Sequence, residues 1–304
     1  MAKRGITSRW LHTPLPFVAA ALASVASLVA CYMFFVHTTT GQYIDESAWS
    51  QAAAFHQRLG TPITSFLDAL PVGSLVVGGL TVLLISAVRR RWLAALVAVV
   101  SMVGADVTTQ VIKALLPERP DRGILTLDFN SLPSGHSTLA ASAATAVFLV
   151  ASPRWRPLIA FLGGSFSIVA GGSTLVNQWH RPADIVAAFL VVAAWGSAAG
   201  WFMVHGKDAR NAWRGYGSFW AASRFWPALC TALGVLSALG SLIVVWPLSG
   251  HATEPTTQYF WAGLALVVIV GYLLSVGATV LFGATTRRGA DGSHASRTRA
   301  LHSV

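Results

Sequence analysis

Long apolar runs alternate with short polar segments along most of this 304-residue chain. A membrane hydrocarbon core about 30 Å thick needs roughly 20 apolar residues per helix, and eight runs approach that length. They lie at about residues 17–37, 71–88, 92–112, 136–151, 157–177, 184–203, 225–248 and 260–282. The pattern predicts an all-α fold, a polytopic transmembrane helical bundle of about eight spans.

The composition agrees with a membrane protein. Hydrophobic residues make up 54% of the chain and charged residues 11%, whereas about a quarter of the residues in soluble globular proteins are charged. The net charge of +10 would suit nucleic acid only if the basic residues gathered on one face. They are instead divided among the loops, so we expect the lipid bilayer as surroundings and no nucleic-acid partner.

The basic residues also predict the orientation of the chain. Of the 21 Lys and Arg residues, all but five fall in loops on one side of the predicted bundle. Basic loops stay on the cytoplasmic side, so we predict a multi-pass cell-membrane protein with both termini in the cytoplasm. The exceptions, expected on the extracytoplasmic face, are Arg58, Lys113, Arg119, Arg122 and Arg181.

Three short polar motifs stand at the predicted extracytoplasmic ends of spans. They read KALLPERP at residues 113–120, PSGH at residues 133–136 and HRPAD at residues 180–184. The motifs are far apart in sequence, yet the order of the spans brings them to one membrane face. We therefore expect them to form one site on the extracytoplasmic side.

The first two motifs suit a phosphate group. Lys113 and Arg119 are cations, and a guanidinium binds phosphate as a bidentate fork while an ammonium acts as a point charge. Ser134 can cap the helix that follows, and Gly135 permits close approach of the backbone. The unpaired N–H groups of a helix start attract anions, so these four residues are predicted to bind the substrate phosphate.

The histidines add catalytic chemistry. His136 would point into the phosphate site, where an imidazole can protonate a leaving oxygen. His180 and Asp184 are four residues apart and share one helix face, so the carboxylate can hold one ring nitrogen while the other attacks phosphorus. We predict His136, His180 and Asp184 as catalytic residues, with a phosphohistidine intermediate on His180. No metal or other cofactor is expected, since clustered metal-ligand spacing is absent from the sequence.

The order of these motifs resembles that of the phosphatidic acid phosphatase type 2 superfamily, over about residues 38–203. The resemblance implies a metal-independent phosphatase with a six-span core. It assigns phosphate binding to Lys113 and Arg119, the phosphate cradle to residues 134–135, and the catalytic roles to the same two histidines and aspartate.

The chain departs from the family pattern in two places. Five residues separate Lys113 from Arg119 where the family has six, and Thr174 stands where the third motif normally has Arg. Losing one preorganised donor typically costs about 3 kcal/mol, on the order of a hundredfold in rate. We hypothesise that Arg181 or Arg122 takes over as the missing phosphate-binding residue, although Arg181 would equally suit lipid head groups.

The resemblance divides the chain into a core and flanking parts. We expect an N-terminal cytoplasmic tail, a six-span phosphatase core, a basic cytoplasmic loop, two additional transmembrane helices and a flexible cytoplasmic tail, at residues 1–16, 17–203, 204–224, 225–282 and 283–304. The segment from Tyr43 to Leu59 fits either an amphipathic surface helix that lies over the site and stops at Gly60, or an ordinary external loop. The last two spans fit dimerisation or a partner protein equally well, so homo-oligomer formation stays open.

Together these observations predict a membrane lipid phosphatase. Polyprenyl pyrophosphate, phosphatidic acid and related lipids are all compatible, because the predicted site residues hold only the phosphate. Two alternatives remain. One is a lipid phosphotransferase that uses the same intermediate; the other, motivated by Thr174, is a non-catalytic membrane transporter or scaffold.

Overall fold

The computed structural model describes residues 15–124, 129–205, 215–217, 219–245 and 257–285, and within these ranges the regular elements are all helices. The α-helices are α2 (Leu15–His37), α3 (Thr39–Arg89), α4 (Trp92–Leu115), α5 (Gly135–Val150), α6 (Arg156–Val176), α7 (Pro182–His205), α8 (Phe225–Val245) and α9 (Gln258–Thr285). Short 3-10 turns at Pro153–Trp155 and Trp220–Ala222 precede α6 and α8.

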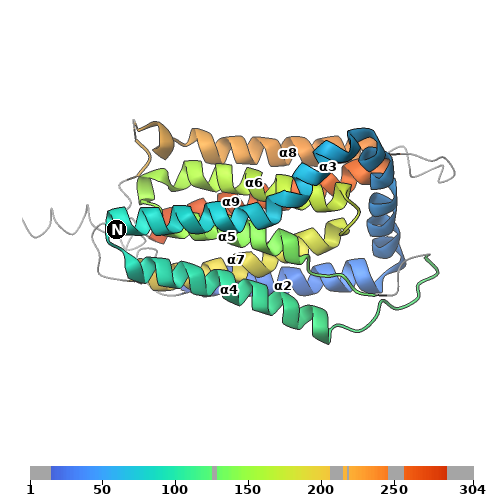
Figure 1. Ribbon diagram of the computed structural model, residues 1–304, viewed down its shortest axis with the longest axis horizontal. Coiled ribbons are helices and arrows are strands. Elements are labelled where there is room, and N and C mark those ends of the chain that lie inside the picture. The colour runs from blue at the N-terminus through green and yellow to red at the C-terminus, as the bar shows by residue number, and fades with distance from the viewer. Residues whose placement is uncertain (1–14, 125–128, 206–214, 218, 246–256, 286–304) are drawn as a thin grey trace, which may run out of the picture.

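The helices form one elongated bundle in which neighbours run side by side (Figure 1). Seven of the described helices contain segments long and apolar enough to cross a membrane, and α5 is a shorter apolar helix of 16 residues. These eight helices correspond to the eight predicted spans. The expected all-α, multi-pass membrane bundle is confirmed.

Helix α3 differs from the sequence prediction. It is a single helix of 51 residues that continues through Gly60, so the predicted stop at Gly60 and the loop alternative for this segment are both wrong. Its first part lies across one end of the bundle, and its second part runs along the other helices (Figure 1). Pro62 and Pro71 fall within it, and prolines inside a helix bend it because they remove a backbone hydrogen bond. We call residues 39–58 the roof segment.

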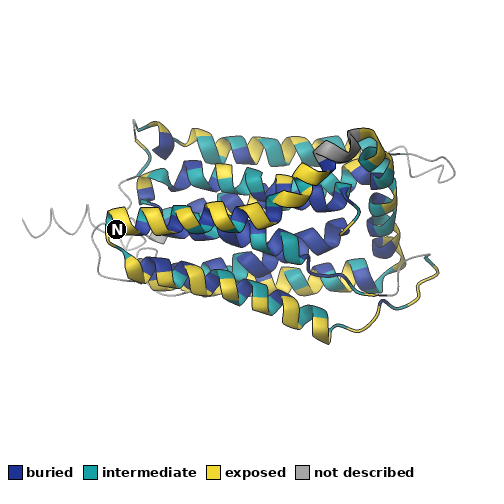
Figure 2. Cartoon of the chain, in the orientation of Figure 1, coloured by how far each residue is buried: buried dark blue, intermediate teal, exposed yellow. Residues whose placement is uncertain are grey.

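The centre of the bundle is formed by α5 and α7, in which most of the described positions are buried (Figure 2). α5 packs against α3, α4, α6 and α7. Its sequence is rich in alanine, serine and threonine, and small side chains let membrane helices approach closely. The central helices therefore hold the starts of α5 and α7 at one end of the bundle.

The last two helices belong to the same bundle. α9 packs against α3, α6, α7 and α8, and its start contacts the roof segment. The backbone N–H of Phe260 donates to Oε1 of Gln51 at 3.1 Å, and the rings of Phe55 and Phe260 stack with centroids 4.2 Å apart. α9 thus braces the roof segment against the end of the bundle.

Candidate active site

The two predicted catalytic histidines lie together at the roofed end of the bundle. His136 is in the first turn of α5 and His180 lies two residues before the start of α7, and their ring centroids are 6.2 Å apart. The ring of His136 also packs against Trp179, with centroids 4.9 Å apart. This spacing puts both imidazoles within reach of one small anion.

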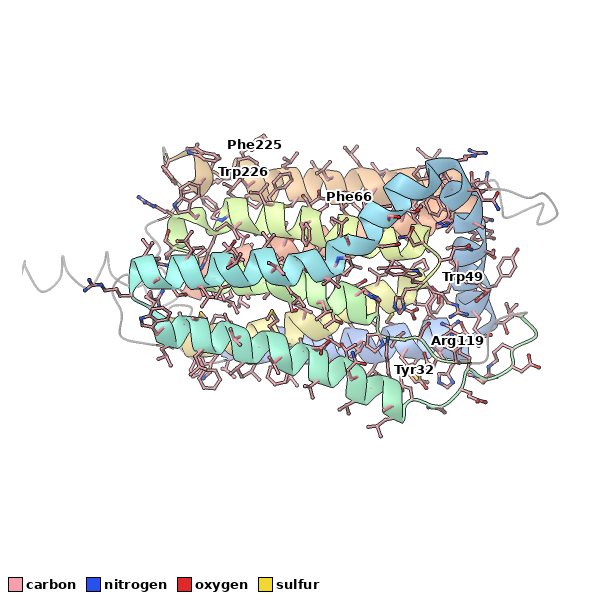
Figure 3. All side chains as sticks on the ribbon, viewed as in Figure 1. Tyr32, Trp49, Phe66, Arg119, Phe225 and Trp226 are labelled. Carbon is pink, nitrogen blue, oxygen red and sulfur yellow. The ribbon has the colours of Figure 1, made fainter. Side chains whose placement is uncertain are left out.

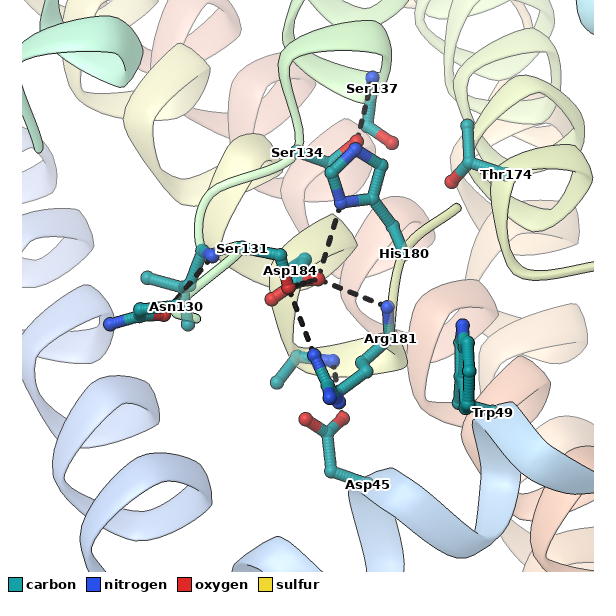
Figure 4. Close-up of polar contacts among 12 residues, drawn as sticks. Asp45, Trp49, Asn130, Ser131, Ser134, Ser137, Thr174, His180, Arg181 and Asp184 are labelled. Carbon is teal, nitrogen blue, oxygen red and sulfur yellow. Dashed lines mark hydrogen bonds and ion pairs between the residues drawn. The ribbon is translucent and has the colours of Figure 1, made fainter. Parts of the chain in front are cut away.

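Asp184 is fully buried beside His180 (Figure 4). Its Oδ2 atom lies 3.2 Å from Nδ1 of His180. The same oxygen accepts hydrogen bonds from the backbone N–H of Arg181 at 3.0 Å and from the Ser131 hydroxyl at 2.6 Å. Three groups therefore contact the same oxygen, Oδ2. The carboxylate occupies Nδ1 of His180, which leaves Nε2 as the ring nitrogen available as a nucleophile.

The start of α5 has the predicted cap. Oγ of Ser134 accepts the backbone N–H of Ser137 at 3.2 Å, and the backbone N–H of Ser134 donates to the Asp184 carbonyl at 2.9 Å. A Cβ atom built on Gly135 would lie 3.9 Å from Nζ of Lys113. The Lys113 ammonium thus sits beside the first turn of α5, where the positive end of the helix dipole also favours an anion.

Arg119 is buried under the roof segment. Its Nη2 atom donates to Oδ2 of Asp45 at 3.0 Å, and both side chains are 0% exposed. Figure 3 shows Arg119 and Trp49 at the same end of the bundle. Burial and the negative charge of Asp184 raise the pKa of Asp45 to about 7, although the Arg119 guanidinium and the Ala183 N–H lower it. The Asp45 carboxyl therefore changes its protonation state near neutral pH.

Arg181 is bound to its surroundings by several contacts. Nε donates to Oε2 of Glu46 at 2.7 Å and Nη1 to the Ser131 hydroxyl at 3.1 Å. The guanidinium carbon also lies 5.8 Å from the centre of the Trp49 ring. Arg181 consequently ties the third motif to the roof segment and to the loop before α5.

Thr174 lies close to the site, and its carbonyl accepts the backbone N–H of His180 at 3.2 Å. Thr174 is fully buried in α6, and its hydroxyl donates to the Gly171 carbonyl at 2.8 Å. Arg122 has an exposed side chain in the loop after α4. That Arg122 or Arg181 replaces the family's arginine stays a prediction.

Sequence reasoning missed four residues of this network: Asp45, Glu46, Trp49 and Ser131. The strongest available signal was the pair of adjacent acids at residues 45 and 46, because the whole chain has only 11 acidic residues. Among the described residues, no group of three or more His, Cys, Asp or Glu side chains could hold a metal ion.

Comparison with known proteins agrees with the motif pattern. A family model described as the PAP2 superfamily matches residues 18–210, which is more than half of the chain. No curated protein and no solved structure matches the chain.

Proposed function

Because the chain belongs to the PAP2 superfamily, whose members are generally phosphatases, we propose that it hydrolyses a phosphomonoester or pyrophosphate carried by a membrane lipid. The observation that supports this most strongly is the placement of His136 and His180, with ring centroids 6.2 Å apart and Asp184 behind His180. We further propose that the site faces the extracytoplasmic side, since the loops at that end carry few of the basic residues.

The proposed reaction has two steps, formation of a phosphohistidine and its hydrolysis. Nε2 of His180 attacks phosphorus, the bond to the leaving oxygen breaks, and His136 gives that oxygen a proton. Water then attacks the phosphohistidine, loses a proton to His136 and releases phosphate together with free His180. Lys113, Arg119 and the first amides of α5 stabilise the phosphoryl oxygens throughout.

An apolar cavity supports a lipid substrate. It has a volume of about 680 Å³ and lies among α2, α5, α6, α7 and α9. At one end it is lined by Cys31 and Val186, and the Cys31 thiol lies 3.7 Å from the carbonyl oxygen of Ala183, the residue before Asp184. A hydrocarbon chain fits such walls, and the lining residue Val186 follows Asp184 by two residues in α7.

The proposal is tested with purified protein in detergent and a metal chelator. Phosphatidic acid, polyprenyl pyrophosphate and a water-soluble phosphomonoester are offered, and phosphate release is measured with the wild type and with His180→Asn. We expect release from at least one lipid by the wild type and none by the variant. Reaction in ¹⁸O-labelled water distinguishes hydrolysis, which puts the label into phosphate, from transfer to another acceptor. Failure of the wild type to release phosphate from any lipid would refute the proposal.

A further inference from the structure

Asp45 of the roof segment connects two motifs that are separate in the sequence. Its Oδ2 accepts a hydrogen bond from Nη2 of Arg119 at 3.0 Å, and its Oδ1 accepts the backbone N–H of Ala183 at 2.9 Å. Ala183 directly precedes Asp184, which holds His180. One buried carboxylate therefore fixes the position of a phosphate-binding arginine relative to the nucleophile.

Gln42 lies one helical turn before Asp45 in the roof segment and binds the loop that carries Arg119 and Pro120. Its Nε2 donates to the Pro120 carbonyl at 2.9 Å and to the Val36 carbonyl at 2.8 Å. Gln42 and Asp45 are three residues apart, so they lie on one face of the helix, and both are buried. The roof segment thus binds the backbone at Pro120 and the side chain of Arg119.

Asp45 contacts only one of the three guanidinium nitrogens of Arg119. Asp45 contacts Nη2, whereas Nε and Nη1 are buried and have no hydrogen-bond partner among the described residues. Buried donors without partners cost free energy, and phosphate oxygens are strong acceptors for a guanidinium. The Asp45 contact therefore determines which edge of Arg119 remains available to an anion.

Fold stability is a weak explanation for this pair. Removing two charges from water costs about as much as their attraction returns, so buried ion pairs often add little net stability. The glutamate at position 46 makes the parallel contact to Arg181, but its side chain is 12% exposed. A contribution to stability therefore does not explain the fully buried carboxylate of Asp45.

We propose that Asp45 is a positioning residue that orients Arg119 toward the transferred phosphate and acts on the reaction only through that guanidinium. This inference rests on the proposed function, because it assumes a phosphate-binding Arg119. It extends the site to the roof segment, which carries none of the three motifs.

A double-mutant cycle tests the proposal. Asp45→Asn keeps an oxygen for the Ala183 N–H but loses the charge that holds Arg119, and it is made alone and together with Arg119→Gln. We expect Asp45→Asn to lower kcat/KM about tenfold in the wild-type background and less than about twofold when Arg119→Gln is present. Glu118→Gln is the matched control: it removes one negative charge beside Arg119 from an exposed side chain and should leave kcat/KM unchanged.

The same cycle is repeated on the binding of inorganic phosphate, followed as the rise in Tm on phosphate addition. Asp45→Asn should weaken binding only where Arg119 is present. If Asp45→Asn lowers kcat/KM or phosphate binding equally in the wild-type and Arg119→Gln backgrounds, the proposal is overturned. A wild-type protein whose Tm does not change on phosphate addition would also overturn it. A wild type that binds phosphate but hydrolyses no lipid would refute the proposed function alone, since the binding cycle still decides the role of Asp45.

Asp45→Glu provides a second variant if Asp45→Asn does not fold. It retains the negative charge but moves the carboxylate by one methylene group. We expect a folded protein with lower kcat/KM and weaker phosphate binding, both dependent on Arg119. A folded Asp45→Glu protein with wild-type values would contradict positioning by this side chain.

Discussion

Buried arginines have different surroundings at the two ends of the bundle. At the roofed end, Arg119 pairs with Asp45 and Arg181 pairs with Glu46. At the opposite end, Arg156 at the start of α6 is 3% exposed, and none of its guanidinium nitrogens has a hydrogen-bond partner among the described residues.

Aromatic rings surround Arg156 in place of carboxylates. Its guanidinium carbon lies 4.8 Å from the centre of the Phe282 ring and 5.8 Å from that of Phe148. The comparison indicates that burial of a cation does not by itself mark a functional site. What distinguishes the roofed end is a set of carboxylates that hold the cations, and two histidines beside them.

The largest effect is expected from the nucleophile. His180→Asn removes the nitrogen that attacks phosphorus, so kcat should fall by about 10⁴-fold or more. Single-turnover phosphate release and Tm are measured together. A folded variant with more than a few per cent of wild-type turnover would exclude His180 as the nucleophile.

Asp184→Asn should have the next largest effect. The amide keeps the shape of the side chain but no longer stabilises a positively charged His180 or fixes its tautomer, and comparable changes in other enzymes cost about 10⁴-fold in kcat. We expect a loss of about 10²-fold or more with KM little changed. Ser131→Ala removes only one of the hydrogen bonds that fix the carboxylate and should cost less; the reverse order would contradict the assignment.

Filling the apolar cavity should affect lipid substrates selectively. Ala193 of α7 lines the cavity, and Ala193→Leu would occupy part of it. KM for a long-chain lipid phosphate should rise several-fold, about 1 kcal/mol, while kcat/KM for a water-soluble phosphomonoester stays the same. Ala228→Leu, on an exposed position of α8, is the matched control. Equal effects on both substrates would argue against a chain in the cavity.

The pH dependence of Asp45→Asn sharpens the role of the roof segment. The pKa of Asp45 is raised to about 7, so its carboxylate and the Arg119 ion pair are present above that pH and are lost as the pH falls through it. Asp45 also interacts electrostatically with Asp184 of α7 and with Cys31 of α2, and Glu46 follows it in the chain. The wild-type to Asp45→Asn ratio of kcat/KM should be largest near about pH 8.5 and approach one below about pH 6. A ratio that does not vary with pH would contradict a titrating Asp45.

The smallest effect is expected at the opposite end. Arg156→Met replaces a buried charge, which has no hydrogen-bond partner in the part of the chain that the structure describes, by an apolar side chain of similar length. Loss of the contacts with Phe148 and Phe282 costs about 1 kcal/mol, and the relieved desolvation offsets it. Tm should be unchanged or raised and phosphate release unaltered; a large fall in release would show that this end also serves the reaction.

The membrane spans and the three motifs could be predicted from the sequence because both are local. Apolar length indicates seven of the described helices as spans, and Ser134 occupies the cap position that its place before an apolar run predicts. His180 and Asp184 do pair as predicted, but not through a shared helix face, because His180 lies before α7 and only Asp184 is within it.

The roof segment could not be predicted in the same way. Gly60 and Pro62 favour a break in the helix, yet α3 continues as one helix. Its first part is held by contacts distant in sequence, such as the hydrogen bond that the Trp49 indole donates to the Gln178 carbonyl at 2.9 Å. Asp45 and Arg119 are 74 residues apart, and their contact depends on the path of α3 across the end of the bundle. Hydrophobic periodicity describes which residues are buried but not which buried charges meet.

The bond between His180 and phosphorus is tested most directly by trapping the enzyme during turnover. Protein mixed briefly with a ³²P-labelled lipid phosphate is quenched in alkali, where phosphohistidine survives, and the labelled residue is identified by mass spectrometry. We predict label on His180, its absence from His180→Asn, and its loss after a chase with unlabelled substrate. Full turnover with no label on His180, or with label on another residue, would contradict the mechanism.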